Sequence, residues 1–116
     1  MDIYPTLLDL CGLELKPQQH LDGLSLKQVL GGQTDREIED RFLAWTYPHK
    51  HGNGHRPSDA ILVGDWKLIR FASDEPDELY NLAQDVSERN NLAEEHPEKV
   101  QSLNEMLDDW FFETKP

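Results

Sequence analysis

The chain has 116 residues, enough for one small domain, and a formal charge of −12 because 23 acidic residues outnumber 11 basic ones. This negative field disfavours general binding to nucleic-acid phosphates or anionic lipids, so any anion site must be locally basic. The single cysteine excludes an intrachain disulfide, and no stretch has the length of a membrane span or the basic and apolar regions of a signal peptide.

The first predicted element is a short helix over residues 2–12, in which apolar residues recur at steps of three and four. Asp2 is expected to cap its first turn and Gly12 to end it. A helix this short is marginal alone, so its apolar face needs a packing partner. Cys11 belongs to that face and is expected to be a buried thiol. The apolar face is formed by Ile3, Leu7, Leu10 and Cys11.

The segment that follows, up to residue 41, is rich in turn signals. An Asp-Gly pair at positions 22–23 favours a turn. Ser25 is expected to cap a short helical turn over residues 26–30, which ends at the two glycines that follow. The charged residues 34–41 are expected to form a solvated turn or a short helix.

Four strands are expected in the middle of the chain. The runs 42–47 and 66–71 alternate between apolar and polar residues, 60–63 is a short apolar run, and 78–82 is a short fourth strand. A Gly-Asp pair between the second and third runs is a two-residue hairpin signal. Consecutive strands joined by turns predict an antiparallel sheet.

Alternation in the strands and helical spacing near the C-terminus indicate the core. Leu43, Trp45 and Tyr47 should share one face of the first strand. We expect Trp45 and Trp66 to lie in the core rather than to stack on a sugar ring. A helix that Pro97 opens is expected to cover the sheet with its apolar stripe. That stripe is formed by Val100, Leu103, Met106 or Leu107, and Trp110.

The segment 47–57 is basic within an acidic chain. It holds three of the five histidines, His49, His51 and His55, with Arg56 and two glycines. Arginine offers a fork of donors, histidines add further donors, and glycines let a ligand approach the backbone. Connections this long are uncommon unless they are functional or disordered. The pattern favours a site for an anion or a sugar.

Two other interpretations of this segment stay open. Three imidazoles could bind zinc, although no H-E-x-x-H pattern is present and Lys50 and Arg56 would repel a cation. The segment could also be a polar hairpin connection without a site. The whole sequence lacks a nucleophile elbow, a phosphate-binding loop and a Rossmann glycine pattern. The residues alone therefore indicate binding rather than catalysis.

Three groups of motifs occur in order along the chain. The first is DIYPTLLDLCG followed by LDGLSL, the second is GDWKLI, and the third is ELYNL followed by Asp85, Glu88 and the run NLA. In order and spacing they resemble the segment after the catalytic core of type I sulfatases, the arylsulfatase family of the alkaline-phosphatase-like superfamily. The resemblance covers nearly the whole chain.

The resemblance implies an enzyme that hydrolyses sulfate esters with a formylglycine nucleophile and a calcium ion, both in a catalytic core that this sequence lacks. The formylglycine motif C/S-x-P-S/A-R is absent, since Gly-Leu-Glu follows Cys11. Residues 1–34 would dock on the missing core, and residues 35–116 would form the C-terminal subdomain. The residues that would then border the substrate cleft, as contacts to a sulfated carbohydrate, are His49, His51, His55 and Arg56.

Together these inferences predict an α+β fold, with a small four-stranded antiparallel sheet, a C-terminal helix packed on it and a short N-terminal helix. The expected function is substrate recognition within a carbohydrate sulfatase, without activity of the chain alone. The alternative is a non-catalytic binding or interaction module that assembles with a separate catalytic chain. The expected partners are the catalytic domain, or a second copy at the helix 2–12, and a sulfated carbohydrate.

Overall fold

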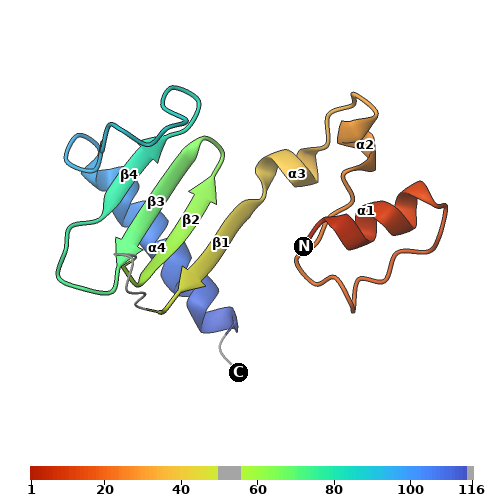
Figure 1. The fold of residues 1–116 in the computed structure, drawn as a ribbon, viewed down its shortest axis with the longest axis horizontal. Coiled ribbons are helices and arrows are strands. Elements are labelled where there is room, and N and C mark those ends of the chain that lie inside the picture. The colour runs from red at the N-terminus through yellow and green to blue at the C-terminus, as the bar shows by residue number, and fades with distance from the viewer. Residues whose placement is uncertain (50–55, 115–116) are drawn as a thin grey trace. The chain divides into compact units, whose positions relative to one another are not determined.

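The structure, a computed structural model, describes residues 1–49 and 56–114 (Figure 1). It divides the chain into two compact units, Met1–Arg41 and Phe42–Pro116. The first unit holds three short helices, and the second holds a four-stranded sheet and one long helix. No helix among the described residues is long and apolar enough to cross a membrane. The predicted α+β fold class is confirmed.

The helices of the first unit are α1 Ile3–Leu10, α2 Lys27–Leu30 and α3 Arg36–Asp40. Gly12 ends α1 as predicted, because its φ of 67° lets the amide of Leu13 reach the carbonyl of Leu8 at 2.8 Å. The hydroxyl oxygen of Ser25 accepts a hydrogen bond from the amide of Lys27 at 3.3 Å, so Ser25 makes the predicted capping contact although Leu26 occupies the N-cap position of α2. The same hydroxyl donates to Asp9 at 2.7 Å.

Asp2 joins the two ends of the first unit and does not cap α1. Its carboxylate accepts hydrogen bonds from both terminal nitrogens of Arg41, at 2.6 and 2.8 Å, and from the amide of Leu24 at 3.1 Å. The predicted capping role of Asp2 is therefore wrong, and α1 has no side-chain cap. A bidentate arginine is a stronger partner for a carboxylate than one amide at a helix end. The hydrogen bond to Arg41 lowers the pKa of Asp2.

The apolar face of α1 is exposed. The residues of α1 that are buried in the first unit are Pro5 and Thr6, whereas Ile3 and Leu7 are 70% and 56% exposed. Cys11 follows at the same four-residue step and is also exposed, so the expectation of a buried thiol is wrong for this chain. The predicted apolar face of α1 therefore exists, but it points away from the interior of the first unit.

The second unit is built on an antiparallel sheet with the strand order β1-β2-β3-β4 (Figure 1). The strands are β1 Phe42–Tyr47, β2 Ser58–Val63, β3 Trp66–Phe71 and β4 Glu78–Asn81. β2 starts before its apolar run because Ser58 pairs with Tyr47 of β1. The predicted hairpin turn between β2 and β3 is confirmed, with Gly64 at a φ of 56°.

Helix α4, Pro97–Thr114, covers one face of the sheet and forms the core with it (Figure 1). The sheet contributes three residues that lie in register on neighbouring strands, and α4 contributes two residues of its apolar stripe. The stripe predicted for the terminal helix is confirmed, with Leu107 as its most buried member. The buried core residues are Ile61, Leu68, Leu79, Leu103 and Leu107.

We call the sheet face opposite α4 the second face. Leu43, Trp45 and Tyr47 share it, as predicted, because successive side chains of a strand point to opposite faces. Trp45 is 42% exposed, so its predicted place in the core is wrong. Trp66 points to the α4 side and packs against the core as expected. Ala44, beside Trp45, also packs against the core, which explains why Trp45 points away from it.

Candidate functional site

The ends of β1 and β2 bring together the two flanks of the predicted recognition loop. Tyr47 and Ser58 form the last pair of the two strands. His49 lies two residues after Tyr47, and Arg56 lies two residues before Ser58, so both emerge at the same end of the sheet. The ring of His49 meets that of Tyr47 edge-on, with centroids 6.3 Å apart. The predicted site residues that lie outside the described residues are His51 and His55.

Arg56 is held against the sheet by three side chains that are distant in the sequence. Its guanidinium carbon lies 3.9 Å from the ring centroid of Phe71. One terminal nitrogen donates to Glu75 and the other donates to Glu78 over 3.4 Å. The hydrogen bond between Arg56 and Glu75 raises the pKa of the arginine and lowers the pKa of the carboxyl. Arg56 is therefore a positive charge in a defined place, paired with carboxylates.

The two carboxylates have further partners. Ser73 donates to Glu75 at 3.0 Å, and the hydroxyl of Tyr80 donates to Glu78 at 2.9 Å. Tyr80 is buried, and burial together with the hydrogen bond to Glu78 raises its pKa to about 12. The hydroxyl therefore stays protonated and keeps donating. We call the following residues the Arg56 cluster: Arg56, Phe71, Glu75, Glu78 and Tyr80.

The Arg56 cluster combines donors, acceptors and an aromatic ring at the end of the second face. Carboxylates accept hydrogen bonds from hydroxyl groups, and arginine donates them to oxygen acceptors, which suits a polyhydroxylated ligand. A sulfate group would compete with Glu75 and Glu78 for the guanidinium of Arg56. The sequence pointed to Arg56 but not to these glutamates, because strand register brings Glu78 to it and the connection between β3 and β4 brings Glu75.

A second polar group of residues lies at the same end of the sheet, on the face that α4 covers. Arg70 donates to Asp108 of α4 at 2.6 Å and lies 3.6 Å from Asp59, which accepts from the hydroxyl of Thr46 at 2.6 Å. With Phe111 these side chains line a hollow of about 370 Å³. Because Arg70 is paired with two carboxylates, this group joins α4 to the sheet rather than attracting an anion.

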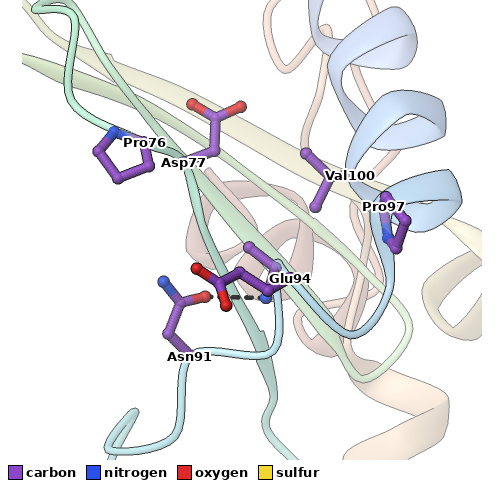
Figure 2. Close-up of a pocket in the computed structure, with 7 residues that line it drawn as sticks. Pro76, Asp77, Asn91, Glu94, Pro97 and Val100 are labelled. Carbon is purple, nitrogen blue, oxygen red and sulfur yellow. Dashed lines mark hydrogen bonds between the residues drawn. The ribbon is translucent and has the colours of Figure 1, made fainter.

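A third candidate is a hollow of about 300 Å³ beside the first turn of α4. Asp77 in its wall accepts a hydrogen bond from Asn104 of α4 at 2.7 Å. Glu94 adds a second carboxylate, so the wall is acidic and would repel a sulfate group. The residues that Figure 2 labels around the hollow are Pro76, Asp77, Asn91, Glu94, Pro97 and Val100.

Metal ligands do not gather in the described part of the chain. Among residues 1–49 and 56–114, no three His, Cys, Asp or Glu side chains are placed to hold a metal ion. The alternative of a zinc-binding loop depends on His51 and His55, which lie outside those residues, so it stays untested.

Comparison with known families gives a match over nearly the whole chain. Residues 1–114 match the family described as N-sulphoglucosamine sulphohydrolase, C-terminal. Arylsulfatase K of Mus musculus is 35% identical over 113 residues, and arylsulfatase K of Danio rerio is 34% identical over 111 residues. Each alignment covers 92% of this chain and 20% of the relative. The chain therefore spans about a fifth of the length of these curated relatives.

Solved structures with the same fold include sulfatases. A 2-O GAG sulfatase superposes with a TM-score of 0.76 over 97% of this chain and 24% of its own, at 23% identity, which supports the fold alone. A protein solved in complex with its substrate D-glucosamine-2-N,6-O-disulfate superposes with a TM-score of 0.69 at 29% identity, over 93% of this chain and 22% of its own. An N-acetylgalactosamine-6-O-sulfatase of Bacteroides thetaiotaomicron is 42% identical over 52 residues, 45% of this chain and 10% of that protein.

Proposed function

The chain belongs to the sulfatase family of C-terminal N-sulphoglucosamine sulphohydrolase domains, and we propose that it forms the substrate-recognising part of a carbohydrate sulfatase. The names of its relatives support a sulfated amino sugar as the substrate class. One relative is a sulfatase of N-acetylgalactosamine, and one structural neighbour was solved with a disulfated glucosamine. The proposed reaction is hydrolysis of a sulfate ester by water, with catalytic groups that the rest of the enzyme supplies.

The pairing of Tyr47 with Ser58 is the observation that carries this proposal. It places His49 and Arg56 at one end of a rigid sheet, where a neighbouring catalytic region can use both. Loops that a rigid scaffold positions in this way commonly carry binding residues. We assign substrate contacts to four residues of this loop, namely His49, His51, His55 and Arg56.

The surroundings of Arg56 explain how this contact would form. Stacking on Phe71 and hydrogen bonds to Glu75 and Glu78 restrict its guanidinium before a substrate arrives. Such restriction lowers the entropy that is lost on binding. A sulfate oxygen would replace a glutamate oxygen on Arg56, and the released carboxylate would accept a hydrogen bond from a sugar hydroxyl. Recognition would then depend on the sulfate and on the sugar together.

The first unit is proposed to attach the chain to the catalytic core. In this proposal residues 1–34 dock on the core, and residues 35–116 form the subdomain that carries the loop. Ile3, Leu7 and Leu10 support the docking, because a helix with an exposed apolar face needs a partner. The formylglycine and the calcium ion are expected in that core, where they would supply the nucleophile and neutralise the sulfate.

Sulfatase assays on two proteins test this proposal. The first is the isolated chain, and the second is a chimera in which this chain replaces the stretch that it matches in mouse arylsulfatase K. We expect no turnover of an aryl sulfate or a sulfated glucosamine by the isolated chain, and turnover by the chimera. Turnover by the isolated chain would contradict the proposal that the rest of the enzyme supplies the catalytic groups. A folded chimera without turnover would overturn the recognition role.

A non-catalytic binding module is the second candidate, because the second unit has a complete core of its own. In that case the isolated chain would bind a sulfated glucosamine in a calorimetric titration without any catalytic partner. The sulfatase proposal expects weak binding by the isolated chain, because only one side of the substrate cleft is present. Micromolar affinity of the isolated chain would favour the module.

A further inference from the structure

The two carboxylates beside Arg56 bind its guanidinium to different extents. Glu75 accepts from one terminal nitrogen and contributes the larger part of the raised pKa of Arg56. The other terminal nitrogen lies 3.4 Å from Glu78, whereas hydrogen bonds of this kind usually measure about 2.7–3.2 Å. The side chain of Arg56 is also 46% exposed. The nitrogen that faces Glu78 is therefore the part of the guanidinium that a ligand reaches with the smallest loss of existing contacts.

Tyr80 explains why the contact between Glu78 and Arg56 is long. Glu78 and Tyr80 are two residues apart on β4, so their side chains lie on the same face of the sheet. The Tyr80 hydroxyl donates to Oε2 of Glu78 at 2.9 Å, and Oε1 of the same carboxylate faces Arg56. Tyr80 is 7% exposed, so its ring has little room to follow a moving carboxylate. With one oxygen held in this way, Glu78 cannot place both oxygens on the guanidinium as the strongest pairing requires.

The surroundings of Tyr80 keep it a permanent donor to Glu78. Burial and the hydrogen bond to Glu78 raise its pKa to about 12, so the hydroxyl stays protonated at any pH at which the fold works. Lys67 is paired with Tyr80 across the strands, but its ammonium group lies 2.8 Å from Glu88 and is engaged there. The hydrogen bond from Tyr80 is therefore the contact that sets the position of the Glu78 carboxylate on the side away from Arg56.

This arrangement determines how a sulfated sugar would meet the two side chains. A sulfate oxygen would take the terminal nitrogen of Arg56 that Glu78 binds weakly, which frees Oε1 of Glu78. Because Tyr80 holds Oε2, the carboxylate would stay in place, and Oε1 would accept a hydrogen bond from a neighbouring sugar hydroxyl. Without the Tyr80 hydroxyl, Glu78 would be free to turn both oxygens toward Arg56 and to compete with the sulfate.

We propose that Tyr80 is a positioning residue for substrate recognition, because its hydroxyl prevents Glu78 from binding Arg56 with both oxygens and so leaves one nitrogen of Arg56 open to a sulfate group. This inference rests on the proposed function, since it requires that Arg56 contacts the substrate. It adds a residue outside the recognition loop, and it assigns the acceptor of a sugar hydroxyl to Glu78.

Steady-state kinetics of the chimera test the effect of Tyr80 on recognition. Tyr80→Phe removes the hydroxyl and keeps the ring, and it should raise the KM for a sulfated glucosamine about two- to fivefold, as a strengthened exposed ion pair would. The kcat should stay within about twofold, because the catalytic groups are untouched. Tyr4→Phe is the matched control, since its hydroxyl donates to Gln19 in the first unit, and it should leave KM unchanged. An unchanged or lowered KM in Tyr80→Phe would overturn the proposal.

A second variant separates positioning from a general structural effect. In the Glu78→Gln background, Tyr80→Phe should cause no further rise in KM, because an uncharged amide does not compete with a sulfate for Arg56. Dependence of one substitution on another identifies residues that act through each other. The same fold-increase in both backgrounds would show that Tyr80 does not act through Glu78, and it would overturn the proposal.

Denaturant unfolding of the isolated chain tests the geometry without a substrate. Arg56→Ala, Glu78→Gln and the double variant give the coupling between the two side chains. This coupling should be weak in the native chain and larger when the same cycle is measured in Tyr80→Phe. Equal coupling in both backgrounds would overturn the proposal. We expect Tyr80→Phe to be folded by circular dichroism, and its unfolding would instead assign the hydroxyl to the stability of the second unit.

Arg56→Ala in the chimera distinguishes this inference from the function on which it rests. An unchanged KM in Arg56→Ala would remove the recognition role of Arg56, and the positioning role of Tyr80 with it. A KM that Arg56→Ala raises but Tyr80→Phe does not change would overturn the positioning role alone.

Discussion

The guanidinium carbon of Arg56 lies 3.9 Å from the ring centroid of Phe71, so the arginine that closes the predicted recognition loop is stacked on the last residue of β3. Glu75 and Glu78 hold its two terminal nitrogens in the same place. The contacts with Phe71, Glu75 and Glu78 restrict the orientation of the Arg56 guanidinium and of its N–H donors. They also set up a competition between the glutamates and any sulfate group for the same nitrogens.

That competition predicts opposite effects for two substitutions in the chimera. Arg56→Ala should raise the KM for a sulfated glucosamine, because a charged hydrogen-bond donor is lost. Glu75→Gln should lower the KM about two- to fivefold, because an exposed ion pair no longer competes with the sulfate. Steady-state kinetics measure both values, with Arg89→Ala as the control for loss of a surface arginine. A KM raised by Glu75→Gln would show that Glu75 itself contacts or positions the substrate.

The hydrogen bond between Asp2 and Arg41 should stabilise the first unit. Asp2→Ala leaves Arg41 without its carboxylate partner and should destabilise the unit by about 1–3 kcal/mol. The amide of Leu24 also donates a hydrogen bond to Asp2, so its hydrogen exchange should become faster when the carboxylate is removed. Asp22→Ala, at an exposed carboxylate, is the control and should leave that exchange unchanged.

The same pair predicts a pH dependence. The pKa of Asp2 is lowered by the hydrogen bond to Arg41 from the ordinary value of 3.8. Its contribution to stability is therefore present above pH 3.8 and is lost as the pH falls through the lowered folded-state pKa. The amide of Leu24 should lose protection over that acidic range, and Asp2→Ala should remove this pH dependence. If the Leu24 amide lost protection over the same acidic range in Asp2→Ala, carboxyl groups other than Asp2 would cause the pH dependence.

Leu107 should be the residue of α4 on which the second unit depends most. It is fully buried against the sheet, so Leu107→Ala leaves a cavity and should lower the free energy of unfolding by about 2–5 kcal/mol. Phe112→Ala removes a larger side chain that is 86% exposed and should change it by less than about 0.5 kcal/mol. Denaturant unfolding measures both, and similar losses would contradict the orientation of α4.

The titration of the Tyr80 hydroxyl should show whether this residue is buried and hydrogen-bonded to Glu78 in the Arg56 cluster. Its pKa is raised to about 12 by burial and by the hydrogen bond to Glu78, from an ordinary value of 10.0. The folded state therefore keeps this proton longer than the unfolded state, and its contribution to stability falls as the pH rises from about 10 to about 12. Phenolate absorbance should contain one component near pH 12 that Tyr80→Phe removes. If Tyr80→Phe removed a component near pH 10 instead, Tyr80 would lie in water rather than in the Arg56 cluster.

Local patterns predicted most of the fold. Alternation identified β1 and β3, the Gly-Asp pair at 64–65 identified the hairpin between β2 and β3, and helical spacing identified α4. Each of these signals lies within a few residues of the element it predicts, which explains its reliability. Asp2 was misread because its partner Arg41 lies 39 residues away and outcompetes the helix end.

The candidate site was harder to predict because it depends on pairing between strands. The composition of the loop singled out Arg56, but Phe71 and Glu78 are brought to it by the register of the sheet, and Glu75 by the connection between β3 and β4. Trp45 and Cys11 were expected to be buried because they occupy apolar patterns. Such a pattern indicates a buried face without saying whether this chain or another polypeptide buries it.

The central claim is that this end of the sheet recognises the substrate while the rest of the sulfatase carries out hydrolysis. The most direct measurement is the comparison of kcat and KM for a sulfated glucosamine between the chimera and its His49→Ala, Arg56→Ala double variant. The account predicts a KM at least tenfold higher, with kcat within about twofold, because uniform binding is lost and the catalytic groups are untouched. A KM that does not change would contradict it.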